Sequence, residues 1–152
     1  MIRSTGESGV LRPRDLSTEE LIEVLEKEHE SLISTLKKLQ DAVSREDAGT
    51  AYSIISGIDE TLVQHMIDEE ANLLKTLIQV FGREGSVEAI EVFREHVDID
   101  ALIKEMKKML YEGKSSRPGM LSQLGDLLAG HFQKEHERVF PCALDAARRL
   151  EG

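Results

Sequence analysis

Mostly apolar residues recur at steps of three or four along four successive stretches of the chain, and this spacing constrains the fold more than any other feature. The first two series are Ile22, Leu25, His29, Leu32, Leu36, Leu39 and Val43, and Ile55, Ile58, Leu62, His65, Glu69, Leu73, Leu77 and Val80. The next two are Ala89, Phe93, His96, Asp100, Ile103, Met106 and Leu110, and Leu121, Leu124, Leu128, His131, Glu135, Val139 and Cys142. Each series lies on one face of an α-helix. The pattern therefore predicts four amphipathic helices.

Local signals predict where these helices begin and end in the first half of the chain. Ser17 and Glu20 form an S-x-x-E capping box, so a helix is expected from there to about residue 45. Gly49 predicts a break after the first helix, and Gly82 predicts the end of the second helix.

Similar signals divide the second half. Ser86 is expected to cap the third helix, which ends at Gly113, and residues 114–119 are expected to form a loop. The fourth helix continues towards Leu150. Pro141 is predicted to bend it, because proline lacks a backbone N–H and clashes with the preceding turn.

Short connections between long helices favour antiparallel neighbours, so the predicted fold is an all-α, up-down-up-down four-helix bundle. An aromatic content of 4%, with no Trp and 3 Pro, also favours helices over sheets. The length of 152 residues fits one domain. We expect this domain to comprise residues 17–152, after a flexible N-terminal arm of residues 1–16.

Composition excludes several classes of partner. A formal net charge of −10 argues against nucleic acid, and no apolar run approaches the roughly 18 residues of a membrane span. The single cysteine, Cys142, cannot form an internal disulfide, and residues 1–16 lack the apolar stretch of a secretion signal. We therefore expect a cytoplasmic protein without a membrane partner, and the oligomeric state stays open.

Each predicted inward face carries one histidine, and these are His29, His65, His96 and His131. Counting at about 1.5 Å per residue from each connection brings all four level in the bundle, so they are expected to form one layer. The fifth histidine, His136, is rotated about 100° from Glu135 and is expected on the surface.

Two glutamates share this layer. Glu69 and Glu135 each follow an inward histidine by four residues, which places a nitrogen and a carboxylate on the same helix face. Buried carboxylates need a partner, and no Lys or Arg shares the inward faces at that depth, so a cation is expected there. Four His and two Glu exceed one tetrahedral zinc site, whereas two cations sharing both carboxylates would use all six. The candidate metal ligands are His29, His65, Glu69, His96, His131 and Glu135.

This arrangement of H, H-x-x-x-E, H and H-x-x-x-E resembles the hemerythrin-like, or HHE cation-binding, domain over residues 17 to about 148. The stretches HMIDEEANLLKTL and HFQKEHERVFP are similar to the second and fourth helices of that family. The resemblance implies two non-haem iron ions with an oxo or hydroxo bridge, each held by two histidines, with Glu69 and Glu135 bridging.

The chain departs from the oxygen-carrying members of that family at two positions. They have a second histidine one turn further along the third of the four helices, where this chain has Asp100. They also have an aspartate five residues after the histidine of the fourth helix, whereas this chain has Glu135 four residues after His131. The ligand pattern is closest to the iron-sensing and iron–sulfur-repair type. Asp100 is interpreted as a ligand, as an acceptor behind a ligating histidine, or as a residue rotated out of the site, with the second favoured.

Three functions follow as hypotheses. The first is a binding or sensing protein whose di-iron centre takes up O2, NO or iron itself, and it is favoured over an enzyme. The second is a redox enzyme or iron donor in iron–sulfur repair or in peroxide and NO detoxification. The third is a structural bundle with core histidines. A ferritin-like site is rejected because only Glu26-x-x-His29 fits its motif, and Cys142 is expected to pack in the core.

Overall fold

Four long helical rods follow the four predicted stretches, and two of the rods change their winding midway. The computed structural model describes residues 16–114 and 119–151. The first rod is α1 (Thr18–Ser44) and the third is α4 (Val87–Tyr111), which a short 3-10 turn, η3 (Glu84–Ser86), precedes. The second rod joins α2 (Ala48–Asp68), η2 (Glu69–Leu74) and α3 (Lys75–Phe81), and the fourth joins α5 (Met120–Lys134), η4 (Glu135–Val139) and α6 (Phe140–Glu151).

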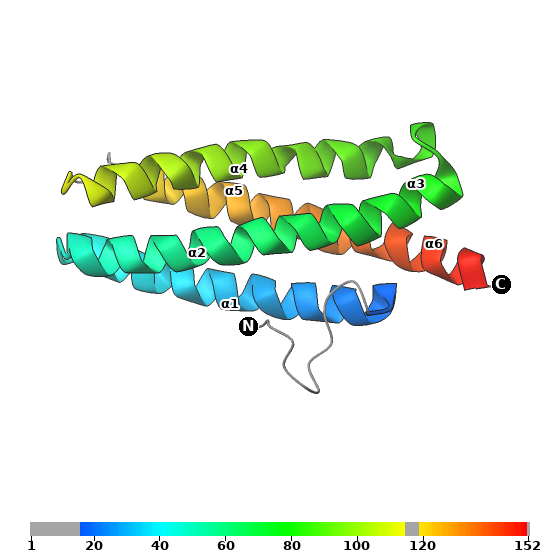
Figure 1. Cartoon of the computed structure of the whole chain (residues 1–152), viewed down its shortest axis with the longest axis horizontal. Coiled ribbons are helices and arrows are strands. Elements are labelled where there is room, and N and C mark those ends of the chain that lie inside the picture. The colour runs from blue at the N-terminus through cyan, green and yellow to red at the C-terminus, as the bar shows by residue number, and fades with distance from the viewer. Residues whose placement is uncertain (1–15, 115–118, 152) are drawn as a thin grey trace.

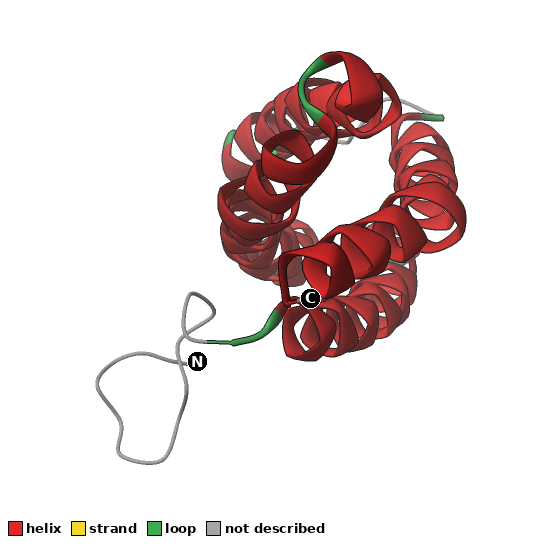
Figure 2. Cartoon of the chain, turned by 90° about the vertical axis from the view of Figure 1, so that its right-hand side faces the viewer, coloured by secondary structure: helices red, strands yellow, loops and turns green. Residues whose placement is uncertain are grey.

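The rods run alternately up and down around one axis (Figures 1 and 2), which confirms the predicted all-helical four-helix bundle. Helix α2 packs against α1 and α4, and α4 packs against α5. Helix α1 also packs against α5 and α6, which closes the ring of rods. Near the C-terminal end, α3 contacts α6 directly. None of the helices within the described ranges combines the length and apolar character that a membrane crossing requires.

Of two predicted helix boundaries in the first half, one is confirmed and one is wrong. The capping box is present: the backbone N–H of Glu20 donates to Ser17 Oγ at 3.1 Å, and that of Ser17 donates to Glu20 Oε1 at 2.9 Å. The predicted break at Gly49 is wrong. The chain turns at Glu46, which has φ 57°, and Asp47 caps α2 by accepting from the Thr50 N–H at 3.1 Å. An aspartate cap can start a helix without help from a glycine.

The glycine stops are confirmed, and the Ser86 cap is not. Gly82 and Gly113 both have φ 74°, a left-handed conformation that favours glycine. Ser86 stands at the position before α4, but its hydroxyl donates to the Gly82 carbonyl at 2.7 Å instead of accepting from the helix. The predicted arm, apart from Leu16, and residues 115–118 of the predicted loop lie outside the described residues.

The winding changes where π-helical segments begin, at Glu69 in the second rod and at Glu135 in the fourth. A π-helix closes i→i+5 hydrogen bonds and takes more residues per turn than an α-helix, so later side chains turn to a different face. Cys142 is consequently exposed and Ala143 is fully buried, which corrects the prediction that Cys142 packs in the core. Pro141 lies in the first turn of α6, two residues after the π-helical segment ends, and the bend predicted there stays a prediction.

The apolar core consists of two clusters with a polar layer between them. One cluster lies towards the α1–α2 turn and includes Leu39, Ile55 and Met106. The other lies towards the chain ends and includes Leu25 and Leu73. The layer between them holds the predicted site.

Candidate metal centre

All six predicted ligands meet in the polar layer, one or two from each rod. His29 lies on α1, His96 on α4, His65 and His131 near the ends of α2 and α5, and Glu69 and Glu135 open the two π-helical segments. All six are buried, with relative exposures of 0% for both glutamates and no more than 8% for any histidine.

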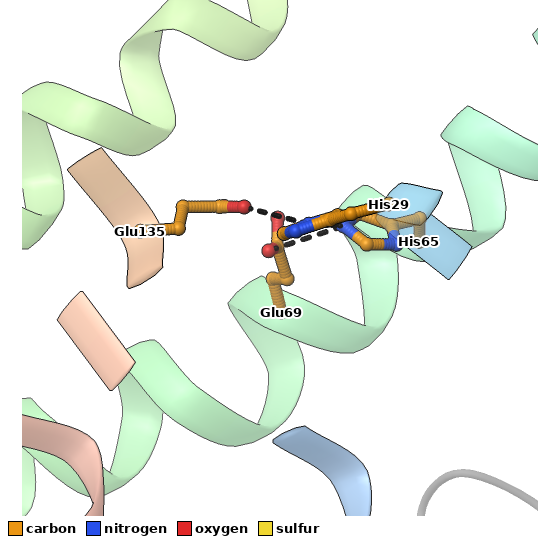
Figure 3. Close-up of side chains that lie close together, drawn as sticks. All are labelled: His29, His65, Glu69 and Glu135. Carbon is orange, nitrogen blue, oxygen red and sulfur yellow. Dashed lines mark hydrogen bonds and ion pairs between the residues drawn. The ribbon is translucent and has the colours of Figure 1, made fainter. Parts of the chain in front are cut away.

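The six side chains form two overlapping groups that could each hold a metal ion. The first, called here the His29 position, consists of His29, His65, Glu69 and Glu135; the second, the His96 position, consists of Glu69, His96, His131 and Glu135. Figure 3 shows the first group, with the two glutamates reaching from different rods towards the two imidazoles. Both groups share both carboxylates.

Each carboxylate directs one oxygen to each group. Glu69 Oε2 lies 3.2 Å from His65 Nε2, and Glu69 Oε1 lies 3.0 Å from His96 Nε2. Glu135 Oε1 lies 3.1 Å from His29 Nε2, and Glu135 Oε2 lies 3.1 Å from His131 Nε2. This is the arrangement of two carboxylates that bridge a pair of cations.

The nitrogens are also spaced as ligands of a shared ion. The Nε2 atoms of His29 and His65 are 3.0 Å apart, and those of His96 and His131 are 3.1 Å apart. When two imidazole nitrogens bind the same ion at about 2.1 Å each, with an N–metal–N angle of about 90°, they lie about 3.0 Å from each other.

The oxygens of the two glutamates lack any other partner. All four are buried, and none accepts a hydrogen bond of suitable direction among the described residues, although the imidazole nitrogens are close. An unsatisfied buried carboxylate is costly. A cation bound between these atoms would satisfy all four oxygens, so the residues fit a two-ion site.

Without a bound ion, the histidines supply part of the positive charge. Burial alone would lower the pKa of His65, but the charge of Glu69 and the hydrogen bond to Glu28 outweigh it and raise that pKa to about 10. Burial is likewise outweighed at His96, whose pKa rises to about 10 beside Glu135 and Glu69. The expectation that only a cation could balance the glutamates is therefore too strict.

The two glutamates titrate as a pair. Burial raises the pKa of Glu69, and the neighbouring Glu135 charge adds to the rise. Burial opposes ionisation of Glu135 too, but the close Glu69 carboxyl and imidazoles hold its pKa well below the usual range. Metal ligands must be deprotonated, so ion binding here displaces protons.

Three further carboxylates, which the sequence reasoning missed, hold the outer nitrogens of the histidines. His65 Nδ1 donates to Glu28 at 2.9 Å, His96 Nδ1 to Glu70 at 3.0 Å and His131 Nδ1 to Glu95 at 2.9 Å. Each comes from the preceding rod. A sequence signal existed, because Glu28, Glu70 and Glu95 each lie directly beside a predicted ligand in the chain.

Asp100 does not belong to the centre. Its side chain is 42% exposed and lies 3.6 Å from Lys104 Nζ, while Ile99 is fully buried in its place. The favoured interpretation of Asp100 as an acceptor behind a ligating histidine is therefore wrong. His136 is on the surface as predicted, with a side chain 70% exposed, and its Nδ1 donates to Glu26 at 2.7 Å.

Comparison with known proteins agrees with this geometry. The model of the Hemerythrin HHE cation binding domain matches residues 20–143, a range that contains all six candidate ligands. No curated protein and no solved structure matches the chain.

Proposed function

The chain belongs to the hemerythrin HHE cation-binding domain family, and from that premise we propose that it binds two iron ions and uses them to take up O2, NO or iron itself. The observation that carries the proposal is the pair of carboxylates shared by the two groups, whose four buried oxygens face the imidazoles but accept no hydrogen bond among the described residues. In a purely structural bundle, these oxygens would have only the imidazole nitrogens at 3.0–3.2 Å as partners, without hydrogen bonds of suitable direction.

The donor set supports iron. His29 and His65 would hold one ion, His96 and His131 the other, and Glu69 and Glu135 would bridge them. Imidazole and carboxylate together suit first-row transition metals with redox chemistry, and iron in such a site supplies electrons to O2 or NO. The protein supplies the geometry and keeps bulk water out, since apolar clusters lie on both sides of the layer.

The ligand count supports sensing, storage or delivery of iron over reversible oxygen carriage. With Asp100 turned to Lys104, the protein offers four imidazoles and two carboxylates for two ions. Six bridging and terminal side chains would leave both ions with open coordination positions. This agrees with the iron-sensing and iron–sulfur-repair type that the ligand pattern resembles.

Repeated exposure to O2 tests the proposal. Protein loaded anaerobically with Fe²⁺ should convert on contact with O2 to a stable ferric form, and evacuation should not restore its original visible spectrum. Full recovery of the reduced spectrum over several cycles would instead establish reversible oxygen carriage. Catalytic turnover of peroxide or NO in the same preparation would establish an enzyme.

A further inference from the structure

The outer nitrogens of the four histidines are not supported equally. In the His96 position, both imidazoles donate from Nδ1 to a carboxylate, His96 to Glu70 and His131 to Glu95. Lys134 also donates to Glu95 and fixes it further. In the His29 position only His65 has such a partner, Glu28. Within residues 16–114 and 119–151, no carboxylate accepts from Nδ1 of His29.

His29 is held by aromatic stacking instead. Its ring lies over Phe132 with 3.8 Å between the ring centroids and an interplanar angle of 12°, and Phe140 stacks at 5.8 Å. These contacts restrain the ring but accept no proton. His29 is also the most exposed residue of the centre, at 8%, against 1% for His65.

A carboxylate behind a ligating histidine fixes the ring and raises the basicity of the nitrogen that binds the metal. Loss of one such partner costs about 10- to 100-fold in metal affinity. The two positions share the same bridging glutamates, so their difference lies in the histidines. The His96 position has two supported imidazoles, and the His29 position has one.

We propose that the His29 position is the weaker of the two metal positions, filling second and emptying first while the His96 position keeps its ion. This rests on the proposed binding of two ions. His29, on the first rod, then belongs to the position whose ion exchanges. Such a centre can release or acquire one ion without losing the other.

Competition between the protein and a chromophoric chelator for Co²⁺ measures both affinities. The wild-type chain should show two dissociation constants that differ by about tenfold or more. Because any second cation is repelled by the first, two constants alone do not assign the positions. His29→Ala should remove the weak binding event and retain the strong one.

Two matched substitutions complete the assignment. Glu28 and Glu95 have similar side-chain exposures, 33% and 30%, and each accepts from one histidine. Glu28→Gln should raise the dissociation constant of the weak event by about tenfold or more, so that the two constants differ further. Glu95→Gln should raise the constant of the strong event by about tenfold or more, so that the two constants become more similar. Circular dichroism checks that each variant is folded.

The outcomes separate the two proposals. If two ions bind but Glu28→Gln and Glu95→Gln weaken the same binding event equally, the proposed difference in affinity between the two positions is wrong, while the two-ion centre stands. Loss of the strong event in His29→Ala would overturn that difference as well. Binding of fewer than one Co²⁺ per chain would overturn both.

Discussion

At the scale of single residues, the centre depends on which helix face each side chain occupies. His131 and His136 lie in the same rod, yet His131 is buried with its Nε2 against Glu135, and His136 points to solvent beside Glu26. Five residues thus separate a candidate ligand from a surface histidine. A pair of alanine substitutions exploits this contrast.

His131→Ala should reduce the metal content of the reconstituted protein by about one ion per chain or more, because it removes one of two imidazoles from the His96 position. His136→Ala should keep the full content. Elemental analysis of the two variants, loaded and desalted in parallel, makes the comparison. Metal loss in His136→Ala with retention in His131→Ala would mean that the fourth rod is turned about its axis.

Asp59 is a buried carboxylate with a separate, structural role. It accepts from Lys104 Nζ at 2.8 and 2.9 Å and from Lys107 Nζ at 3.3 Å. Burial by itself would raise the pKa of Asp59, but these two lysines outweigh burial and hold the pKa below its usual value. A depressed folded-state pKa stabilises the fold above the unfolded-state pKa, and that contribution is lost as the pH falls through the folded-state pKa.

Asp59→Asn should therefore lower the free energy of unfolding by about 1–3 kcal/mol at pH 7, and the difference from the wild type should shrink towards pH 2. Urea denaturation at several pH values measures this. Asp100→Asn is the control, since Asp100 is exposed and its contact with Lys104 is longer; it should change stability by less than about 0.5 kcal/mol. An Asp59→Asn deficit that is equally large at pH 2 would contradict the charge-based explanation.

At the scale of the helical elements, the two π-helical segments are the part that the sequence analysis did not anticipate. The first and third rods keep the alternation of three and four that the sequence shows. In the second rod, the buried residues instead follow steps of four, and in the fourth rod they do the same: His65, Glu69, Leu73 and Leu77, and His131, Glu135, Val139 and Ala143.

Steps of four are a signal for such a segment. In an α-helix of about 3.6 residues per turn, each step of four turns a side chain about 40° away from the inward face. Three such steps would carry Leu77 or Ala143 out of the core. A wider turn compensates for this drift, and it begins in both rods at the glutamate of the candidate centre. Periodicity alone therefore predicted the fold and the layer in which the six candidate ligands meet, but it misplaced Cys142.

Cys142 provides a direct test of this winding. Because it is exposed, its thiol should react with a thiol reagent in the native protein at a rate within about tenfold of that in the unfolded protein. In a Cys142→Ala, Ala143→Cys double variant, the thiol replaces a fully buried side chain and should be protected. Protection of the native Cys142 and free reaction at position 143 would indicate an uninterrupted α-helix.

At the scale of the whole molecule, the polar layer divides the core, so the site and the stability of the bundle are connected. The sequence predicted this layer from the matching depths of four histidines. Glu28, Glu70 and Glu95 lie beside predicted ligands in the chain, but this adjacency does not fix their contacts, which depend on how neighbouring rods are rotated. The place of Asp100 also depends on rotation, because a shift of one residue along the helix moves its side chain from the layer to the surface.

Metal binding should stabilise the bundle, since the ligands converge only in the folded state. At an ion concentration about 100 times the dissociation constant, linkage gives about 2.7 kcal/mol, or a rise in Tm on the order of 5–10 °C for a domain of this size. Thermal melts with chelator and with Co²⁺ measure the shift. Melts that coincide within error would mean that the buried layer binds no ion.

The measurement that tests the central claim most directly is the metal content of the chain. Protein should be loaded with Fe²⁺ without oxygen, freed of unbound metal and subjected to elemental analysis, with the protein quantified by amino-acid analysis because the chain has no Trp and only 2 Tyr. Six converging ligands that form two overlapping groups predict about two iron ions per chain. A content below about 0.3 ions per chain after careful reconstitution would contradict the di-iron centre.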